Sequence, residues 1–67
     1  MDLKKIFEKF VDKKVIITDI DEKRFMGIID DYIDAEDNYS NKEGIILNTK
    51  SGLYEFTKDD IKKIELI

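Results

Sequence analysis

The spacing of apolar residues changes once along this chain, near residue 14, and that change limits the folds open to it. Before this point Leu3, Ile6, Phe7 and Phe10 are three or four residues apart, which predicts one apolar stripe on a helix. Asp2 is placed to cap that helix, so we expect a helix over about residues 2–11. A helix this short is unstable alone in water, so its apolar face must pack against the rest of the chain.

Beyond residue 14, short runs rich in β-branched and aromatic residues predict β-strands. The expected strands cover residues 15–18, 23–33, 45–47, 53–56 and 61–67. Gly27 lies inside the second of them, where a glycine usually marks a bend, a bulge or a close backbone approach. The connections between strands are short, except for a polar loop over residues 34–43.

The predicted fold class is therefore mainly β, with one short N-terminal helix and a five-stranded SH3-like small barrel over about residues 13–67. Residues 1–67 form a single domain in this interpretation. Such a meander either closes with no free edge or stays open and pairs with neighbouring subunits. Residues 57–60 are expected to form a tight connection, with one 3₁₀ turn as an option. One alternative remains open: Thr57 and Asp60 resemble a capping box, which would place a helix over residues 57–66.

Composition excludes several classes of function. The 67 residues include no cysteine and no histidine, so disulfide scaffolds, thiolate zinc sites, imidazole bases and Ser-His pairs are ruled out. No apolar run approaches the ~20 residues that cross a membrane, and no signal peptide opens the chain. We expect a cytoplasmic, non-catalytic domain with no cofactor and no small-molecule substrate.

The polar loop begins with oxygen-bearing side chains at every second position, as a calcium-binding loop does: Asp34, Glu36 and Asn38. The match then fails, because the positions that require Gly and Glu are Tyr39 and Ile45 when counted from Asp34. A weak cation site of another kind is one interpretation, and a solvated loop is the simpler one. We expect no metal site.

Adjacent carboxylates occur at Asp30–Asp31 and at Asp59–Asp60. Neighbouring residues of a regular strand point to opposite faces, so neither pair converges on one point if its strand is regular. Together with the absence of histidine, cysteine and a Gly-rich phosphate loop, this spacing predicts that the protein is not an enzyme.

Negative charge is concentrated in residues 15–37, where eight acidic and two basic residues give a net charge of −6, against −4 for the whole chain. An acidic surface repels phosphate backbones and favours basic partners. The candidate acidic partner face consists of Asp19, Asp21, Glu22, Asp30, Asp31, Glu36 and Asp37.

The aromatic residues divide into core and candidate ligand-binding positions. Phe25 and Phe56 are expected in the core. Tyr39 lies in the polar loop beside Asn38 and Asn41, which is the most ligand-like setting in the chain. Its ring either stacks on a base or a peptide, or closes over one end of the barrel.

Residues 27–64 resemble the Sm-like (LSM) family, and in particular small bacterial proteins with that domain. Gly27, Ile29 and Tyr32 match the opening of the family's first motif, and Asp34 and Asn38 keep its Asp-to-Asn spacing after one extra residue. The second motif is matched less well. Its apolar positions are present, but Thr57 and Lys58 replace its Arg-Gly pair, and Asp59 follows.

The resemblance implies a helix followed by a bent five-stranded barrel, and a binding module associated with RNA. Carried over to this chain, the implied single-stranded RNA contacts are Asp34, Asn38, Tyr39 and Lys58. The family's arginine is absent here, which weakens that prediction. The resemblance also implies a homo-oligomer in which the fourth strand of one subunit pairs with the fifth of the next. The alternative is that the last strand closes the monomer's own barrel.

A second function remains equally open. The acidic residues favour a protein-interaction module that binds a basic partner without contacting nucleic acid. The chain is similar, at the level of helix plus barrel, to the Sm-like inhibitor of the transcription terminator Rho, whose acidic Sm-like domain occupies an RNA-binding surface.

Overall fold

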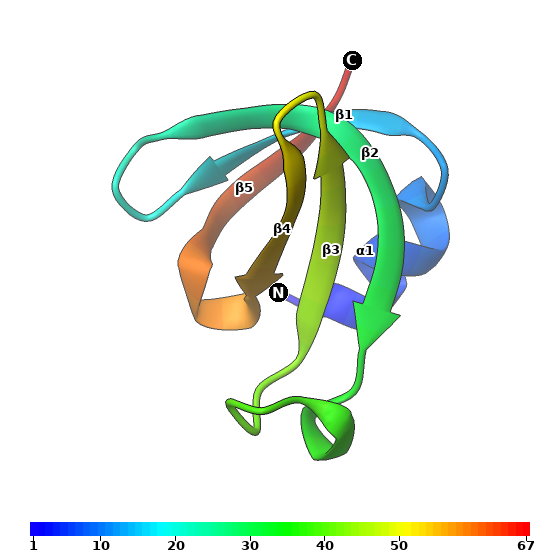
Figure 1. Cartoon of the computed structure of the whole chain (residues 1–67), viewed down its shortest axis with the longest axis vertical. Helices are drawn as coiled ribbons and strands as arrows, with labels where there is room; N and C mark the ends of the chain where they lie inside the picture. Colours follow the sequence, from blue (N-terminus) through cyan, green and yellow to red (C-terminus); the bar gives the residue numbers. More distant parts are fainter.

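The computed structural model describes all 67 residues and contains one α-helix, five strands and two short 3₁₀ helices (Figure 1). In chain order the elements are α1 (Leu3–Phe10), β1 (Lys14–Asp19), β2 (Arg24–Ile33), η1 (Ala35–Asp37), β3 (Gly44–Thr49), β4 (Gly52–Thr57), η2 (Lys58–Asp60) and β5 (Ile61–Leu66). The predicted helix and all five predicted strands are confirmed, with small differences at their ends.

Helix α1 forms as its sequence predicts. The carboxylate of Asp2 accepts a hydrogen bond from the backbone N–H of Lys5 at 3.2 Å, which satisfies one of the free amides of the first turn. The helix ends at Phe10, and Asp12 adopts a left-handed conformation with φ of 65° just beyond it. Leu3 is fully buried, and the ring of Phe7 packs 5.8 Å from that of Tyr32 on β2. The apolar stripe therefore packs on the sheet.

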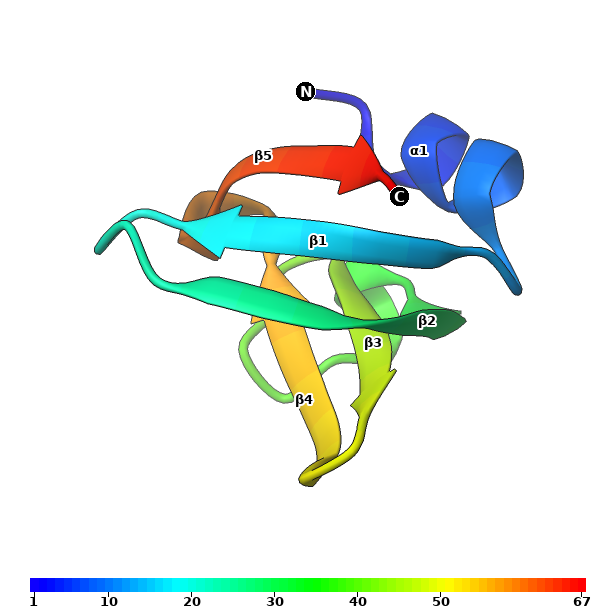
Figure 2. The same cartoon turned by 90° about the horizontal axis from the view of Figure 1, so that it is seen from above.

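The five strands form one antiparallel sheet in the order β4-β3-β2-β1-β5. Strand β2 is the longest: its first half pairs with β1, and its second half pairs with β3. The sheet bends strongly along β2, so the β3–β4 hairpin crosses the β1–β2 pair when the molecule is seen from above (Figure 2). Strands β4 and β5 remain edges, so the sheet is open, and the version of the prediction with no free edge is wrong.

The core lies inside the bend of the sheet and consists of aliphatic side chains from α1 and every strand, with one phenylalanine. Its buried members are Leu3, Val15, Ile17, Ile29, Ile45, Leu47, Phe56 and Ile61. Phe25, on β2, packs 5.1 Å from Phe56 on β4, measured between ring centres, and joins the two halves of the bent sheet. Both phenylalanines therefore contribute to the core as expected, Phe56 fully and Phe25 in part.

Two further expectations are settled by the backbone. Residues 61–66 form a strand, so the helix predicted as an alternative over residues 57–66 is wrong, and a 3₁₀ helix over Lys58–Asp60 is present instead. The assumption of a regular strand at Asp30 and Asp31 is also wrong. The register between β2 and β3 shifts between Ile29 and Asp31, and both carboxylates are exposed. No helix is long and apolar enough to cross a membrane.

Candidate functional site

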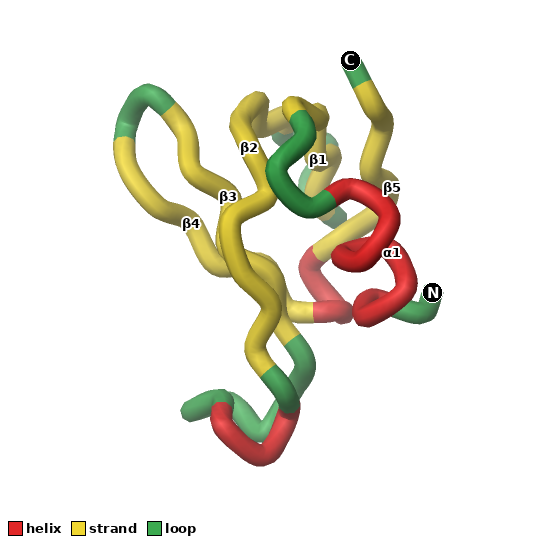
Figure 3. Tube along the Cα trace, turned by 90° about the vertical axis from the view of Figure 1, so that its right-hand side faces the viewer, coloured by secondary structure: helices red, strands yellow, loops and turns green.

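The RNA contacts predicted from the sequence lie around the β2–β3 loop, residues 34–43, which projects beyond the sheet together with η1 (Figure 3). Tyr39 is fully exposed at 105%, and no aromatic partner lies beside it. Asn38 is 8% exposed, and its side-chain amide donates to the carbonyl of Lys42 at 2.7 Å and to Glu55 Oε2 at 2.6 Å. Both amide hydrogens of Asn38 are therefore used within the chain.

The other two predicted contacts lie on either side of the loop. Asp34 precedes η1 and makes no capping hydrogen bond with its side chain. Lys58, in η2, is exposed, and its backbone N–H donates to the carbonyl of Glu43 at 3.1 Å. The contact between η2 and the end of the loop brings Lys58 to the same end of the molecule as Tyr39.

Acidic groups dominate this end of the molecule. A shallow hollow of about 410 Å³ is lined by Asp34, Ala35, Glu36 and Glu43. Nearby, Lys42 is paired with Asp59 at 2.7 Å, which raises the pKa of Lys42 and lowers the pKa of Asp59. No group of three acidic side chains is arranged to hold a metal ion. The local charge therefore opposes the approach of a phosphate backbone.

Tyr32 connects the loop to the sheet. Its hydroxyl donates to Glu43 Oε1 at 2.6 Å. This hydrogen bond to a carboxylate, with partial burial and the negative charges of Glu43 and Asp34, raises the pKa of Tyr32 above its ordinary value of 10.0. Tyr32 is therefore a structural support of the loop in the protonated form.

The residues of the predicted acidic partner face do not form one surface. Asp19 is part of the β1–β2 turn, where its carboxylate accepts from the backbone N–H groups of Asp21 and Lys23 at 2.9 Å each. Glu22, in the same turn, is ion-paired with Lys62. The remaining four lie elsewhere, on β2 (Asp30 and Asp31) and in η1 (Glu36 and Asp37). The residues of the predicted face therefore lie at three places in the fold: the β1–β2 turn, β2 and η1.

A second hollow, which we call the basic groove, was not predicted from the sequence. It has a volume of about 420 Å³ and lies where the first half of β2 meets the β3–β4 turn. Its lining consists of three cations, two aromatic rings, two hydroxyls and a thioether: Lys14, Arg24, Lys50, Phe25, Tyr54, Thr49, Ser51 and Met26. The lining contains no carboxylate, in a chain with sixteen acidic residues.

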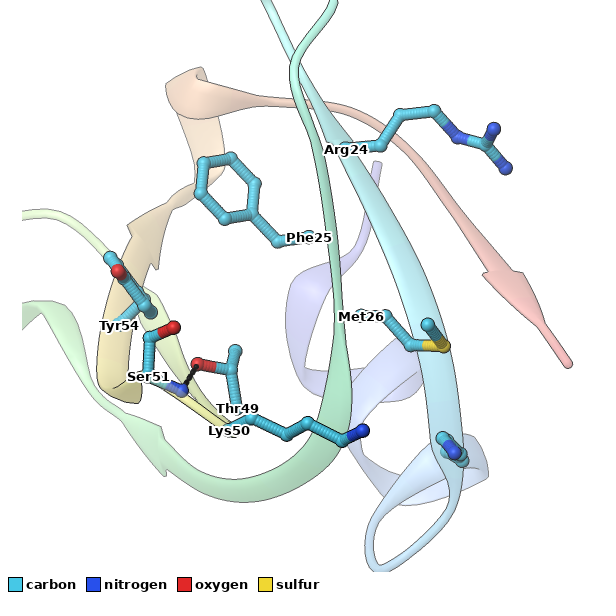
Figure 4. A pocket seen from close by; sticks show the side chains of 8 residues that line it. Arg24, Phe25, Met26, Thr49, Lys50, Ser51 and Tyr54 are labelled. Atoms are coloured by element: carbon cyan, nitrogen blue, oxygen red, sulfur yellow. Dashed lines mark hydrogen bonds between the residues drawn. The ribbon is translucent and has the colours of Figure 1, made fainter.

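The three cations come from three different elements. Lys14 begins β1, Arg24 begins β2 opposite Thr18 of β1, and Lys50 is in the β3–β4 turn. In Figure 4, Arg24 and Met26 point to one side of β2, and the side chain of Lys50 reaches from the turn toward that strand. The antiparallel β1–β2 register and the bend of β2 thus assemble a site from residues far apart in the sequence.

The β3–β4 turn that carries Lys50 is held by its own side chains. Thr49 Oγ1 accepts from the backbone N–H of Ser51 at 3.1 Å and donates to the carbonyl of Gly52 at 2.9 Å (Figure 4). Gly52 has a φ of 120°, which disfavours any residue with a Cβ. These bonds fix the position from which Lys50 extends.

The aromatic wall of the groove is a stack of packed rings. Phe25 points toward Tyr54 (Figure 4), with ring centres 5.5 Å apart and an interplanar angle of 47°. Tyr54 is 40% exposed, whereas Phe25 continues into the core through Phe56. Tyr54 therefore leaves part of its ring exposed to solvent, while Phe25 packs against it from the core side.

None of the three groove cations is neutralised within the chain. The ion pairs of this protein involve Lys42, Lys62 and Lys63 instead. Sequence analysis missed the groove because its cations are at positions 14, 24 and 50, and charge summed over contiguous segments hides them among acidic neighbours. The one usable signal was the alternation of side chains along β1 and β2. Successive side chains of a strand point to opposite faces of the sheet, so Lys14 and Arg24 lie on the face opposite Val15 and Ile17.

Comparisons of this chain with protein-family models, with curated proteins and with solved structures find no match. The Sm-like assignment thus rests on the motif pattern of residues 27–64 and remains a proposal.

Proposed function

We propose that this protein is a non-catalytic Sm-like binding module that binds single-stranded nucleic acid, RNA in the first instance, in the basic groove. The observation that carries this proposal is the set of three unpaired cations, Lys14, Arg24 and Lys50, around a hollow that has a partly exposed tyrosine and no acid. Unpaired cations are common in this chain, so the feature specific to the groove is that three of them line one hollow without a carboxylate.

The lining suits a short stretch of single strand. Lysine and arginine neutralise phosphates, and an exposed tyrosine face stacks on a base without selecting its identity. The hydroxyl of Ser51 is available as a further polar contact at the rim. Three cations neutralise about three phosphates, so the affinity should be modest and log Kd should change with log salt with a slope near 2.

The groove is favoured over the loop contacts predicted from the sequence for two reasons. Asn38 uses its amide hydrogens within the chain, and the carboxylates of Asp34, Glu36 and Glu43 surround the loop. Tyr39 and Lys58 are exposed, but they lie in this acidic surrounding. Both facts support a nucleic-acid site at the other end of β3.

Fluorescence anisotropy with a labelled uridine 10-mer at about 50 mM salt tests the proposal. Lys50→Gln and Arg24→Gln should each weaken binding by about 3- to 10-fold and reduce the salt slope by about 0.7. Tyr54→Leu should weaken binding about 5-fold or more with no change of slope. Lys58→Gln is the matched control, because it removes the same charge at the opposite end, and it should leave affinity within about 2-fold.

Two outcomes would overturn the proposal. If wild-type protein does not bind the oligonucleotide at about 50 mM salt, the groove is not a nucleic-acid site. If Lys58→Gln weakens binding and Lys50→Gln does not, the ligand contacts the β2–β3 loop as the sequence suggested.

A second candidate function is the acidic protein-interaction module. It is favoured by Glu36 and Asp37, which are exposed on the projecting η1 and make no ion pair with a cation of the chain. Capture of an arginine-rich peptide should decrease between about 50 and 500 mM salt, and Glu36→Gln with Asp37→Gln should abolish it. Capture that does not depend on salt or on these two residues would contradict this function.

Assembly is a separate proposal. Strand β5 pairs with β1 of its own chain, and the outer edges of β4 and β5 have no partner. The free edges support a homo-oligomer in which β4 of one subunit pairs with β5 of the next, as the family resemblance implies. Backbone pairing of this kind should persist at high salt.

A further inference from the structure

The two ends of this molecule are complementary in shape and in charge. At one end the basic groove is a hollow lined by three unpaired cations, Met26 and the exposed face of Tyr54. At the other end the β2–β3 loop projects from the body, with Glu36, Asp37 and Tyr39 exposed (Figures 1 and 3). One end accepts acidic and aromatic groups, and the other end presents them.

A single copy cannot bring these ends together. The loop leads into β3 at Gly44, and the turn that carries Lys50 follows the other end of the same strand at Thr49. A strand of this length holds its ends about 17 Å apart, at about 3.3 Å per residue. Figure 1 shows the loop and the turn at opposite ends of the molecule. Any contact between loop and groove must therefore join two copies.

We propose that the groove of one copy receives the β2–β3 loop of a second copy, with Glu36 and Asp37 facing Lys14, Arg24 and Lys50. Tyr39 then packs against the ring of Tyr54, which is 40% exposed. This pairing gives the unpaired cations of the groove and the unpaired carboxylates of η1 their missing partners. Tyrosine is also a residue type that is enriched at the energetic centres of protein interfaces.

The contact is head-to-tail, so each copy keeps one free groove or one free loop after pairing. Interfaces of this kind extend into chains or close into rings. A single short loop in a shallow groove is smaller than a standard interface, so association should be weak and dependent on salt. The proposal shares the groove with the proposed function, and it predicts that nucleic acid and the loop exclude one another.

Sedimentation velocity tests the proposal on the full chain. At about 0.5 mM protein and 25 mM salt we expect a weight-average mass at least about 1.5-fold above the value at about 500 mM salt, where only pairing between strand edges would remain. The monomer mass is 7.9 kDa. Lys50→Glu and Asp37→Lys should each abolish association. Lys58→Glu and Glu8→Lys are the matched controls, because they make the same charge changes at exposed sites outside the contact, and they should associate as wild type does.

Mixing the two inactive variants gives the decisive result. Lys50→Glu keeps its loop and loses its groove, and Asp37→Lys keeps its groove and loses its loop. Their mixture should associate again at about 25 mM salt, because the loop of Lys50→Glu and the groove of Asp37→Lys are intact and the two reversed charges attract each other. Pairing between edges β4 and β5 cannot give this result, because neither variant changes those edges.

Several results would overturn the proposal. They are a mass that does not change with salt, or a mixture of the two variants that associates no more than either variant alone. Failure here is separable from failure of the proposed function, because oligonucleotide binding is measured at protein concentrations too low for association. If the oligonucleotide binds but does not dissolve the oligomer, the shared groove is wrong.

Discussion

The side-chain amide of Asn38 donates a hydrogen bond of 2.6 Å to Glu55 Oε2 and so ties the β2–β3 loop to edge strand β4. The same amide donates to the carbonyl of Lys42 at 2.7 Å. Gly44 leaves room for this arrangement, since a Cβ there would lie 3.2 Å from Asn38 Nδ2. Asn38 therefore holds the loop in place, and its burial follows from that role.

Asn38→Ala should lower the free energy of unfolding by about 2 kcal/mol, because it removes a hydrogen bond to a charged acceptor and leaves the Lys42 carbonyl without its partner. Urea denaturation measures this change. Ser40→Ala, at an exposed position in the same loop, is the control and should change stability by less than about 0.5 kcal/mol. Nucleic-acid affinity should be unchanged in both. A loss of affinity with normal stability would instead support the loop contact predicted from the sequence.

Much of the fold could be predicted because its signals are local. The apolar spacing of α1, the cap at Asp2 and the β-branched run of β1 depend on near neighbours in the sequence. The 3₁₀ turn after β4 is also local, since the backbone N–H and the hydroxyl of Thr57 both donate to Asp60 Oδ2. The open edges of the sheet were not predictable, because they depend on how far β2 bends.

The candidate site could not be predicted, because its geometry depends on contacts between distant residues. The partner of Asn38 is seventeen residues away at Glu55, so the sequence pattern alone indicated a ligand contact where the structure has an internal hydrogen bond. Lys14, Arg24 and Lys50 meet only after the hairpins pair and β2 bends. Charge averaged along the chain indicated an acidic protein and hid its one basic groove.

The bend of β2 depends on Gly27. A Cβ at this position would lie 2.9 Å from the carbonyl carbon of Asn48 and 3.1 Å from Leu47 Cγ. Because the nearest obstacle is backbone, we expect Gly27→Ala to destabilise the fold by about 3 kcal/mol. Thermal unfolding followed by circular dichroism measures the change. Met26→Ala, next to it but half exposed, should cost less than about 1 kcal/mol. Equal melting temperatures for Gly27→Ala and wild type would show that β2 and β3 separate easily here.

The ion pair of Lys42 and Asp59 predicts an effect at acid pH. The hydrogen bond and the charge of Lys42 lower the pKa of Asp59 below its ordinary value of 3.8. A folded-state pKa below the unfolded value stabilises the fold at pH above 3.8, and this contribution is lost as pH falls through the folded pKa. Both side chains are largely exposed, so salt should weaken the pair.

Carboxyl NMR titration checks this prediction directly. Lys42→Gln should move the pKa of Asp59 up toward its ordinary value, because both the hydrogen bond and the positive charge are removed. Lys50→Gln removes the same charge at the other end of the molecule and should leave the titration of Asp59 unchanged. If Asp59 titrates at its ordinary pKa in the wild type, the pair does not persist in solution.

Tyr32 predicts the corresponding effect at alkaline pH. The donor–acceptor distance of 2.6 Å to Glu43 Oε1 and the carboxylate charge hold the pKa of Tyr32 above 10.0. A folded-state pKa above the unfolded value gives stabilisation that is fully present below pH 10.0 and is lost as pH rises through the folded pKa. Tyrosinate absorbance should therefore show one of the three tyrosines ionising late, together with loosening of the β2–β3 loop.

Two variants separate the causes of that shift. Glu43→Gln keeps a hydrogen-bond acceptor but removes its charge, so the pKa of Tyr32 should fall toward 10.0 while the loop stays folded. Tyr32→Phe should remove the late-ionising tyrosine from the titration and leave the other two unchanged. Because α1 packs on this ring through Phe7, Tyr32→Phe keeps that contact and tests the hydroxyl alone. A late-ionising tyrosine that survives Tyr32→Phe would assign the effect to another ring.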